Sequence, residues 1–178
     1  MNRRRVLAAA GLSPMFVSVA SASPATRAKP RPGDLLVHAF GEQAGQLIVP
    51  DEVGDERVFA FPRSSDGVVR DGSLHNQVSL LKLNEAAMTE KTRAFAAGPF
   101  VAVSAACTHA GCEISGWNSA TAELECPCHG SRFDVLDAAR VVNGPATKPL
   151  AYLPIGFEND GFRVTGVFSR RVGPPPSY

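Results

Sequence analysis

Two short runs of cysteine and histidine constrain this chain more than any other feature. They read CTHAGC at residues 107–112 and CPCHGS at residues 126–131. Together they follow the pattern C-x-H-x16-C-x2-H, and each run holds one further cysteine. Thiolates and imidazoles bind soft and borderline metal ions, so the pattern predicts a metal centre shared by the two runs. A structural zinc site with two cysteines and two histidines is one centre of this composition.

The pattern closely resembles the ligand motif of the Rieske iron–sulfur family, in which two histidines replace two cysteines on one iron of a [2Fe–2S] cluster. We favour this interpretation over zinc and over a plain disulfide framework, because zinc fingers rarely carry a glycine and a spare cysteine in each loop. The resemblance implies a [2Fe–2S] cofactor and one-electron transfer rather than bond-making chemistry. It places two cysteines on the buried iron and two histidines on the outer iron. The implied ligands are Cys107, His109, Cys126 and His129.

The two remaining cysteines are Cys112 and Cys128. In Rieske proteins of the cytochrome bc and arsenite oxidase types, the matching pair forms a disulfide that links the two cluster loops. The resemblance therefore implies a disulfide between these cysteines, and such a bond requires an oxidising compartment. Two free buried thiols are the alternative.

Two residues that follow the second ligand histidine are expected to tune the cluster. By resemblance, the hydroxyl of Ser131 donates a hydrogen bond to a bridging sulfide, which raises the reduction potential. The alternative is a loop serine bonded to its own backbone. Phe133 stands where high-potential cytochrome bc members usually carry tyrosine, whose hydroxyl bonds the first ligand cysteine. Without that donor the potential should lie below the top of the family's range, and Phe133 also suits a core position.

Two further sequence features bear on the resemblance: one departs from the cytochrome bc type, and the other matches a loop of the family. Ala110 stands where cytochrome bc proteins usually carry a leucine that packs on cytochrome b, so alanine argues against docking at a quinol site. Residues 144–150 match the proline loop that covers the cluster in this family, with an ordinary turn as the alternative. The covering residues that we assign are Gly144, Pro145 and Ala146.

The histidines outside the motif are His38 and His75, which we interpret as surface or structural residues. A Rieske oxygenase needs a second iron site with two histidines and a carboxylate. Only this distant pair remains for such a site, and the chain lacks room for a catalytic domain.

Strand-like segments dominate the rest of the chain. Its 16 glycines and 14 prolines favour a loop-rich β domain over a helical bundle. Short apolar runs predict strands at residues 35–37, 47–49, 58–61, 77–83, 100–104, 122–125, 133–142 and 162–168. An asparagine cap and a closing Gly-Pro pair predict one helix over residues 84–97, and a turn is expected at 117–118. The expected fold is all-β: a Rieske-type antiparallel sandwich or barrel with a small cluster-binding subdomain and one short helix.

Residues 1–22 look like a twin-arginine export signal, since adjacent arginines precede an apolar run that ends in Ala-Ser-Ala. An uncleaved anchor is the alternative, although the apolar run is short for a spanning helix. We expect a linker at 23–33, a Rieske domain at 34–172 whose cluster-binding part covers about 104–150, and a proline-rich tail at 173–178. Without the signal, 15 basic and 17 acidic residues give a net charge of −2, which does not favour nucleic-acid binding. A membrane contact is expected only if the leader is retained.

The expected function is that of a periplasmic electron-transfer subunit that is not catalytic on its own. It would accept electrons from a larger catalytic redox subunit, of the arsenite oxidase kind or similar, and pass them to a cytochrome c. The first alternative is the Rieske subunit of a quinol–cytochrome c reductase, with a retained anchor and quinol contact at the outer imidazoles. The second is a non-redox binding module on the same fold, against which the four intact ligands and both spare cysteines argue.

Overall fold

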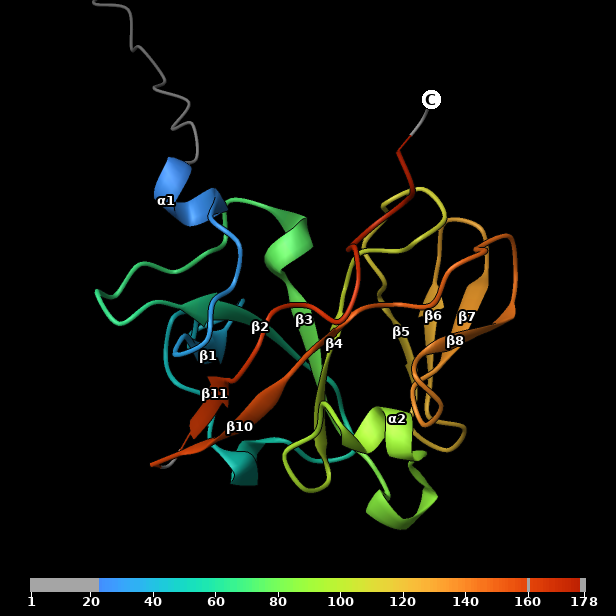
Figure 1. The fold of residues 1–178 in the computed structure, drawn as a ribbon, viewed down its shortest axis with the longest axis horizontal. Coiled ribbons are helices and arrows are strands. Elements are labelled where there is room, and N and C mark those ends of the chain that lie inside the picture. The colour runs from blue at the N-terminus through green and yellow to red at the C-terminus, as the bar shows by residue number, and fades with distance from the viewer. Residues whose placement is uncertain (1–22, 160, 177–178) are drawn as a thin grey trace, which may run out of the picture.

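A computed structural model describes residues 23–159 and 161–176, and its strands form two antiparallel sheets (Figure 1). The seven-stranded sheet has the order β10-β11-β1-β2-β3-β4-β9, and the four-stranded sheet the order β5-β6-β7-β8. The larger sheet contains β1 (Leu35–His38), β2 (Val58–Arg63), β3 (Val78–Lys82), β4 (Phe100–Ser104), β9 (Tyr152–Leu153), β10 (Ile155–Glu158) and β11 (Gly161–Val164). The smaller contains β5 (Gly116–Asn118), β6 (Glu123–Cys126), β7 (Ser131–Asp134) and β8 (Arg140–Asn143). The short helices are α1 (Pro24–Arg27), η1 (Pro50–Glu52), η2 (Leu74–Asn76), η3 (Glu85–Ala87) and α2 (Glu90–Arg93). The all-β expectation is confirmed.

The larger sheet is a nearly closed barrel. Its two edge strands, β9 and β10, follow each other in the chain with only Pro154 between them. Proline has no N–H to donate to a ladder and is confined to such edges and bends. Because the edges are joined by one residue, the sheet curls until they lie near each other.

The central strands β3 and β4 are buried on both faces, and they separate two apolar cores. Successive side chains of a strand point to opposite faces. Leu80 and Ala102 therefore pack inside the barrel, together with Phe162. Leu81 and Val101 point the other way, into the core that the barrel shares with the smaller sheet. The cluster-binding sheet is thus built directly on the barrel wall.

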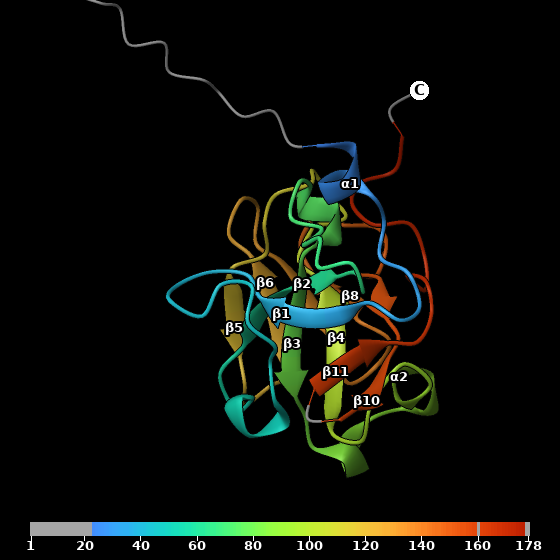
Figure 2. The same cartoon turned by 90° about the vertical axis from the view of Figure 1, so that its left-hand side faces the viewer.

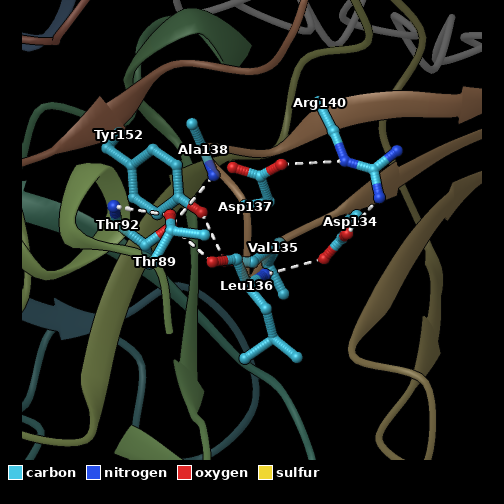
Figure 3. A network of polar contacts seen from close by, with 9 residues as sticks. All are labelled: Thr89, Thr92, Asp134, Val135, Leu136, Asp137, Ala138, Arg140 and Tyr152. Carbon is cyan, nitrogen blue, oxygen red and sulfur yellow. Dashed lines mark hydrogen bonds and ion pairs between the residues drawn. The ribbon is translucent and has the colours of Figure 1, made fainter. Parts of the chain in front are cut away.

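The turn between β7 and β8 is fastened to the barrel by a buried polar network (Figure 3). Thr92 Oγ1 on α2 donates to the carbonyl of Leu136 and accepts from the N–H of Ala138, both at 2.9 Å. The Tyr152 hydroxyl on β9 donates to the carbonyl of Val135 at 2.6 Å. Burial raises the pKa of Tyr152, so this hydroxyl stays protonated as a donor.

A second set of polar contacts joins the start of the smaller sheet to the barrel. The guanidinium of Arg57, just before β2, donates to the carbonyls of Ile114 and Ser115 at 2.9 and 2.5 Å. The indole N–H of Trp117 on β5 donates to the carbonyl of Asp55 at 2.8 Å. The smaller sheet is therefore held at two separate places.

The helix predicted over residues 84–97 is wrong in extent. Only the 3₁₀ turn η3 and the single α-helical turn α2 form there. Thr89 is the N-cap of α2 and begins a new helix inside the predicted one. Four-residue helices gain little from propensity, so the contacts of Thr92 with the β7–β8 turn account for the position of α2.

Two strand predictions and one turn prediction also need correction. Residues 133–142 form a hairpin, β7 and β8, rather than one strand. In the turn, Ala138 and Ala139 have φ of 52° and 49°, a left-handed conformation that alanine rarely adopts. The turn contains no glycine or asparagine, the residues that usually indicate this conformation in a sequence. The expected turn at 117–118 is part of β5, and residues 47–49 contribute only an isolated bridge between Leu47 and Val37. Strands β9 and β10 were not predicted.

The segment expected to be a linker, 23–33, contacts the barrel. The carbonyl of Thr26 in α1 accepts from the N–H of Gly72, and the carbonyl of Ala28 accepts from the side-chain amide of Asn76 at 2.9 Å. The export signal expected at residues 1–22 lies outside the described residues. Within 23–159 and 161–176, no helix has the length and apolar character needed to span a bilayer.

Candidate metal centre

The first cysteine–histidine run forms a tight loop after β4. The N–H of Gly111 donates to the carbonyl of Cys107, and the N–H of Cys107 donates to the carbonyl of Cys112, both at 2.9 Å. Gly111 adopts a φ of +78°, which glycine accepts at little cost. A bridge between Ala106 and Glu113 closes the base of the loop. The two ends of the run are thereby fixed relative to each other.

The second run is the connection between β6 and β7. Cys126 ends β6 and pairs with Ser131, which begins β7. The N–H of Gly130 donates to the carbonyl of Cys126 at 3.0 Å, with Gly130 at a φ of +68°. In Figure 1 this hairpin loop and the loop that follows β4 lie at the same end of the molecule.

The two loops are joined by a disulfide between Cys112 and Cys128, whose Cα atoms are 6.6 Å apart. The cysteines that resemblance pairs are thus bonded to each other in the structure. Cys126 Sγ lies within 4.8 Å of both disulfide sulfurs. Because these two sulfurs are bonded to each other, they offer no thiolates, and they link the loops rather than bind metal.

The four predicted ligand side chains meet in two pairs. Cys107 and Cys126 are both buried, carry free thiols and belong to the same core cluster. Burial raises the pKa of Cys107, and the neighbouring Cys126 adds to this effect. His109 and His129 lie at the surface, with their Nδ1 atoms 3.2 Å apart and their rings perpendicular. The structure thus holds the four predicted donors as a buried thiol pair and a surface imidazole pair.

This donor set fits a [2Fe–2S] cluster with mixed ligands. Two buried sulfur donors suit one iron and two outward imidazoles suit the other, which is the Rieske division of ligands. The two Nδ1 atoms, 3.2 Å apart, also mark a place where two nitrogen donors converge. The ligand assignment of each residue stays a prediction.

The covering loop packs closely on the second run through Gly144. A Cβ atom at this position would lie 2.5 Å from the Cα of Ser131 and 2.8 Å from the carbonyl oxygen of Gly130. Gly144 also has a φ of +84°. Both facts require glycine here, because any side chain would push the loop off the centre. Pro145 beside it is exposed and Ala146 is buried.

Ser131 is fully buried next to the thiol pair. Its Oγ accepts a hydrogen bond from the N–H of Ala146 at 3.1 Å. The hydroxyl proton is not used in this bond and remains free for an acceptor within the centre. The serine thus holds the covering loop, a contact that sequence reasoning missed, and it can also act as the predicted donor to a sulfide.

Thr108 supplies a second connection to the covering loop that the sequence did not reveal. Its hydroxyl donates to the carbonyl of Lys148 at 2.6 Å. Thr108 lies between the two expected ligands of the first run and is itself buried. A threonine at the unspecified position of the C-x-H motif was the only sequence signal of this contact.

The remaining candidates fall outside the centre or at its rim. Phe133 is fully buried and faces Leu124 across β6 and β7, as a core aromatic would. Ala110 is exposed beside His109. His38 ends β1 and pairs with Glu52, its Nε2 3.2 Å from the carboxylate Oε2.

Comparison with known proteins agrees with this geometry. Residues 66–154 match the family described as the Rieske [2Fe-2S] domain. A "Putative respiratory nitrate reductase subunit Rieske" from Haloferax mediterranei is 38% identical over 67% of this chain and 52% of its own. A "Cytochrome bc1 complex Rieske iron-sulfur subunit" from Streptomyces lividans is 32% identical over 82% of this chain and 94% of its own.

Other relatives are longer, and this chain spans only 38% of the Rieske iron-sulfur subunit of the cytochrome bc1 complex from Mycobacterium bovis, at 32% identity over 78% of the chain. Among solved structures, the soluble domain of Rieske protein II from Sulfolobus acidocaldarius is 23% identical, with a TM-score of 0.41 over 54% of this chain and 66% of its own. The matched region includes both cysteine–histidine runs and the covering loop. The chain belongs to the Rieske [2Fe–2S] family, and its cofactor is a [2Fe–2S] cluster.

Proposed function

We propose that this protein is the one-electron carrier subunit of a larger exported oxidoreductase complex, taking electrons from a catalytic partner and passing them to a cytochrome c or a similar carrier. A bound [2Fe–2S] cluster supplies a centre that gains and loses one electron at a time. The observation that carries the proposal is the pair of surface imidazoles, His109 and His129, above the buried thiols. They provide an exposed edge through which an electron can enter or leave.

The rest of the chain holds this edge in a fixed position. The disulfide fixes the two loops to each other, and the covering loop is held to the second run by the hydrogen bond from the N–H of Ala146 to the buried hydroxyl of Ser131. A rigid site needs little rearrangement when its charge changes, which suits fast electron transfer. Within the described residues, no second cluster of histidine and carboxylate ligands accompanies the centre.

The nature of the complex is supported by the relatives' names. They are described as subunits of a cytochrome bc1 complex and of a respiratory nitrate reductase. This chain spans about half or less of the length of several of these relatives, so we only propose their kinds of partner for this protein. An arsenite-oxidase-like complex rests on motif resemblance alone. The Rieske subunit of a quinol–cytochrome c reductase is the second candidate, and the several relatives of that kind favour it.

The proposal is tested by isolating the full chain anaerobically and measuring its iron, zinc and acid-labile sulfide. We expect iron and sulfide in the ratio of a [2Fe–2S] cluster. The dithionite-reduced protein should give an electron paramagnetic resonance spectrum with an average g value below that of all-cysteine clusters. Zinc in place of iron, or no signal, would contradict the electron-transfer function and favour a non-redox module.

The two candidate complexes differ at the imidazole edge. In a quinol-oxidising complex, His109 and His129 contact quinol, so adding a quinone to the native complex should alter the spectrum. In a relay that meets only proteins, the spectrum should be unaffected. Ala110 beside His109 offers a single methyl group to a partner, which favours the second outcome.

We also propose that the protein is exported to the periplasm. The disulfide between Cys112 and Cys128 requires an oxidising compartment, and the expected twin-arginine signal would deliver a folded, cluster-loaded chain there. Protein purified from the native cell should begin near Ser23 when its N-terminus is sequenced. A chain that still begins at the arginines would instead support a retained anchor.

Replacement of Phe133 by tyrosine should raise the reduction potential. The new hydroxyl would donate a hydrogen bond to the sulfur of Cys107, and such a bond favours the reduced, more negative state by about 1 kcal/mol. Phe133→Leu, which adds no donor, is the control. Potentiometric titration of both variants checks the prediction, and an equal potential in tyrosine and leucine variants would show that the hydroxyl does not reach sulfur.

A further inference from the structure

A groove of about 600 Å³ with a strongly basic rim lies outside the metal centre. Its cations come from Lys29, Arg170 and Arg171, with His75 beside them. Val167 and Phe168 add apolar surface, and Val167 is 69% exposed. No carboxylate lines the groove in the part of the chain that the structure describes. We call this surface the basic groove.

The basic groove is a fixed feature, because the segments that form it are hydrogen-bonded to each other or to the barrel. The side-chain amide of Asn76 donates to the carbonyl of Ala28, next to Lys29. The N–H of Tyr152 donates to Ser169 Oγ, and the N–H of Ser169 donates to the carbonyl of Tyr152, at 2.9 and 2.8 Å. The cations are thus presented from ordered backbone rather than from a free tail.

The C-terminal segment connects the basic groove to the first cluster loop. Gly173 packs on the imidazole of His75, where a Cβ would lie 2.9 Å from Nε2. Pro174 packs on Gly111, two residues after the expected ligand His109, where a Cβ would lie 3.5 Å from the ring of Pro174. In Figures 1 and 2, η2, the C-terminal segment and the cluster loops occupy the same end of the molecule.

We propose that the basic groove docks the acidic face of the protein that exchanges electrons with this centre, an inference that rests on the proposed electron-transfer function. Without residues 1–22 the chain has a net charge of −2, so its overall charge would not attract an acidic partner. A local cluster of cations with no acid among them does attract one, and it guides the encounter beside the exposed imidazoles.

The composition of the basic groove also suits a redox encounter. Such complexes bury little surface, dissociate quickly, and combine a small apolar contact with a charged rim. Val167 supplies an exposed apolar contact, and Lys29 and Arg170 supply the charges. A partner docked there would lie against the C-terminal segment that touches the first cluster loop.

The first test measures electron transfer to small oxidants of opposite charge. The reduced protein is mixed with ferricyanide, a trianion that takes one electron to become ferrocyanide, or with the trication tris(phenanthroline)cobalt(III), which takes one electron to become cobalt(II). The double variant Lys29→Gln/Arg170→Gln should lower the second-order rate constant for ferricyanide about 3- to 10-fold at low salt, and should not lower that for the cobalt complex. Raising the ionic strength to about 0.15 M should remove most of the difference. Arg171 is left intact because its Nε donates to the carbonyl of Pro174 and holds the C-terminal segment.

The matched control removes two cations elsewhere, in Lys82→Gln/Lys91→Gln. Both lysines are exposed, and Lys82 lies at the end of β3 away from the cluster loops, opposite the first residue of β4. Lys91 is on α2, at the far end of the molecule in Figure 1. This variant loses the same formal charge and should keep its ferricyanide rate within about 2-fold of the parent.

The second test does not depend on the cluster. Binding of a ten-residue glutamate peptide, measured by calorimetry, should weaken at least about 5-fold in Lys29→Gln/Arg170→Gln and not in the control. Equal behaviour of the two double variants in rate and in peptide binding would overturn the docking site. A chain that binds the peptide through the basic groove but lacks a cluster signal would overturn the proposed function and leave the acidic docking surface standing.

Discussion

Replacement of Gly144 by alanine is expected to destabilise the protein by about 3 kcal/mol and to lower the fraction of chains that retain the cluster. The added Cβ would lie 2.5 Å from the Cα of Ser131 and 2.7 Å from its nitrogen, which are backbone atoms and cannot turn away. The covering loop must therefore move, and its Ala146 N–H then loses the hydroxyl of Ser131. Urea unfolding followed by circular dichroism gives the stability, and iron per chain gives the occupancy.

Gly67→Ala is the matched control for this substitution. Gly67 has a φ of +87°, close to the +84° of Gly144, but no atom lies within 4 Å of the position that its added methyl group would take. Both variants carry the cost of a left-handed alanine, about 1 kcal/mol. Only Gly144→Ala adds the collision with the second run. Similar losses of stability in the two variants, with full iron in both, would mean that the covering loop does not depend on close approach.

The sequence revealed the centre far better than its surroundings. Resemblance to the Rieske motif brought Cys107, His109, Cys126 and His129 into one hypothesis, because the ligand spacing lies within two short loops and can be read directly from the sequence. Ser131 and Gly144 were also selected from the sequence. The close contact between their segments, which are 13 residues apart in the chain, was not predicted. Such contacts leave no periodicity in the chain.

Secondary structure was predicted correctly where burial imposes an apolar pattern on the sequence. It was predicted wrongly where tertiary contacts override the local conformational preference of the residues. Strand β4 was found because all its residues are apolar or small and buried. The β7–β8 turn was missed because Ala138 and Ala139 resemble strand or helix residues, yet they adopt a left-handed conformation. The helix over residues 84–97 was overestimated because its alanine-rich composition favours one continuous helix, whereas in the structure a new helical turn begins at the N-cap Thr89. Both errors meet at one residue, Thr92, which fastens α2 to that turn.

Thr92→Val should therefore destabilise the protein by about 2 kcal/mol. Valine has the same shape but neither donates nor accepts, so the partly buried N–H of Ala138 loses its partner. The carbonyl of Leu136 keeps the N–H of Thr89 and suffers less. For a chain of this length the melting temperature should fall by roughly 5 °C. Circular dichroism during urea and thermal unfolding measures both quantities.

Thr92→Ser separates the hydroxyl from the methyl group, because serine retains the donor and acceptor and loses one buried methyl, worth about 1 kcal/mol. If packing rather than hydrogen bonding fixed the turn, serine would cost more than valine.

Tyr152→Phe removes the second fastening, the hydroxyl that donates to Val135. Since Tyr152 and Thr92 hold adjacent residues of one turn, the two losses should not add, and the double variant should cost less than the sum of the single variants. Additive losses would instead mean that the barrel holds the cluster-binding sheet through independent contacts, and that the turn does not act as a unit.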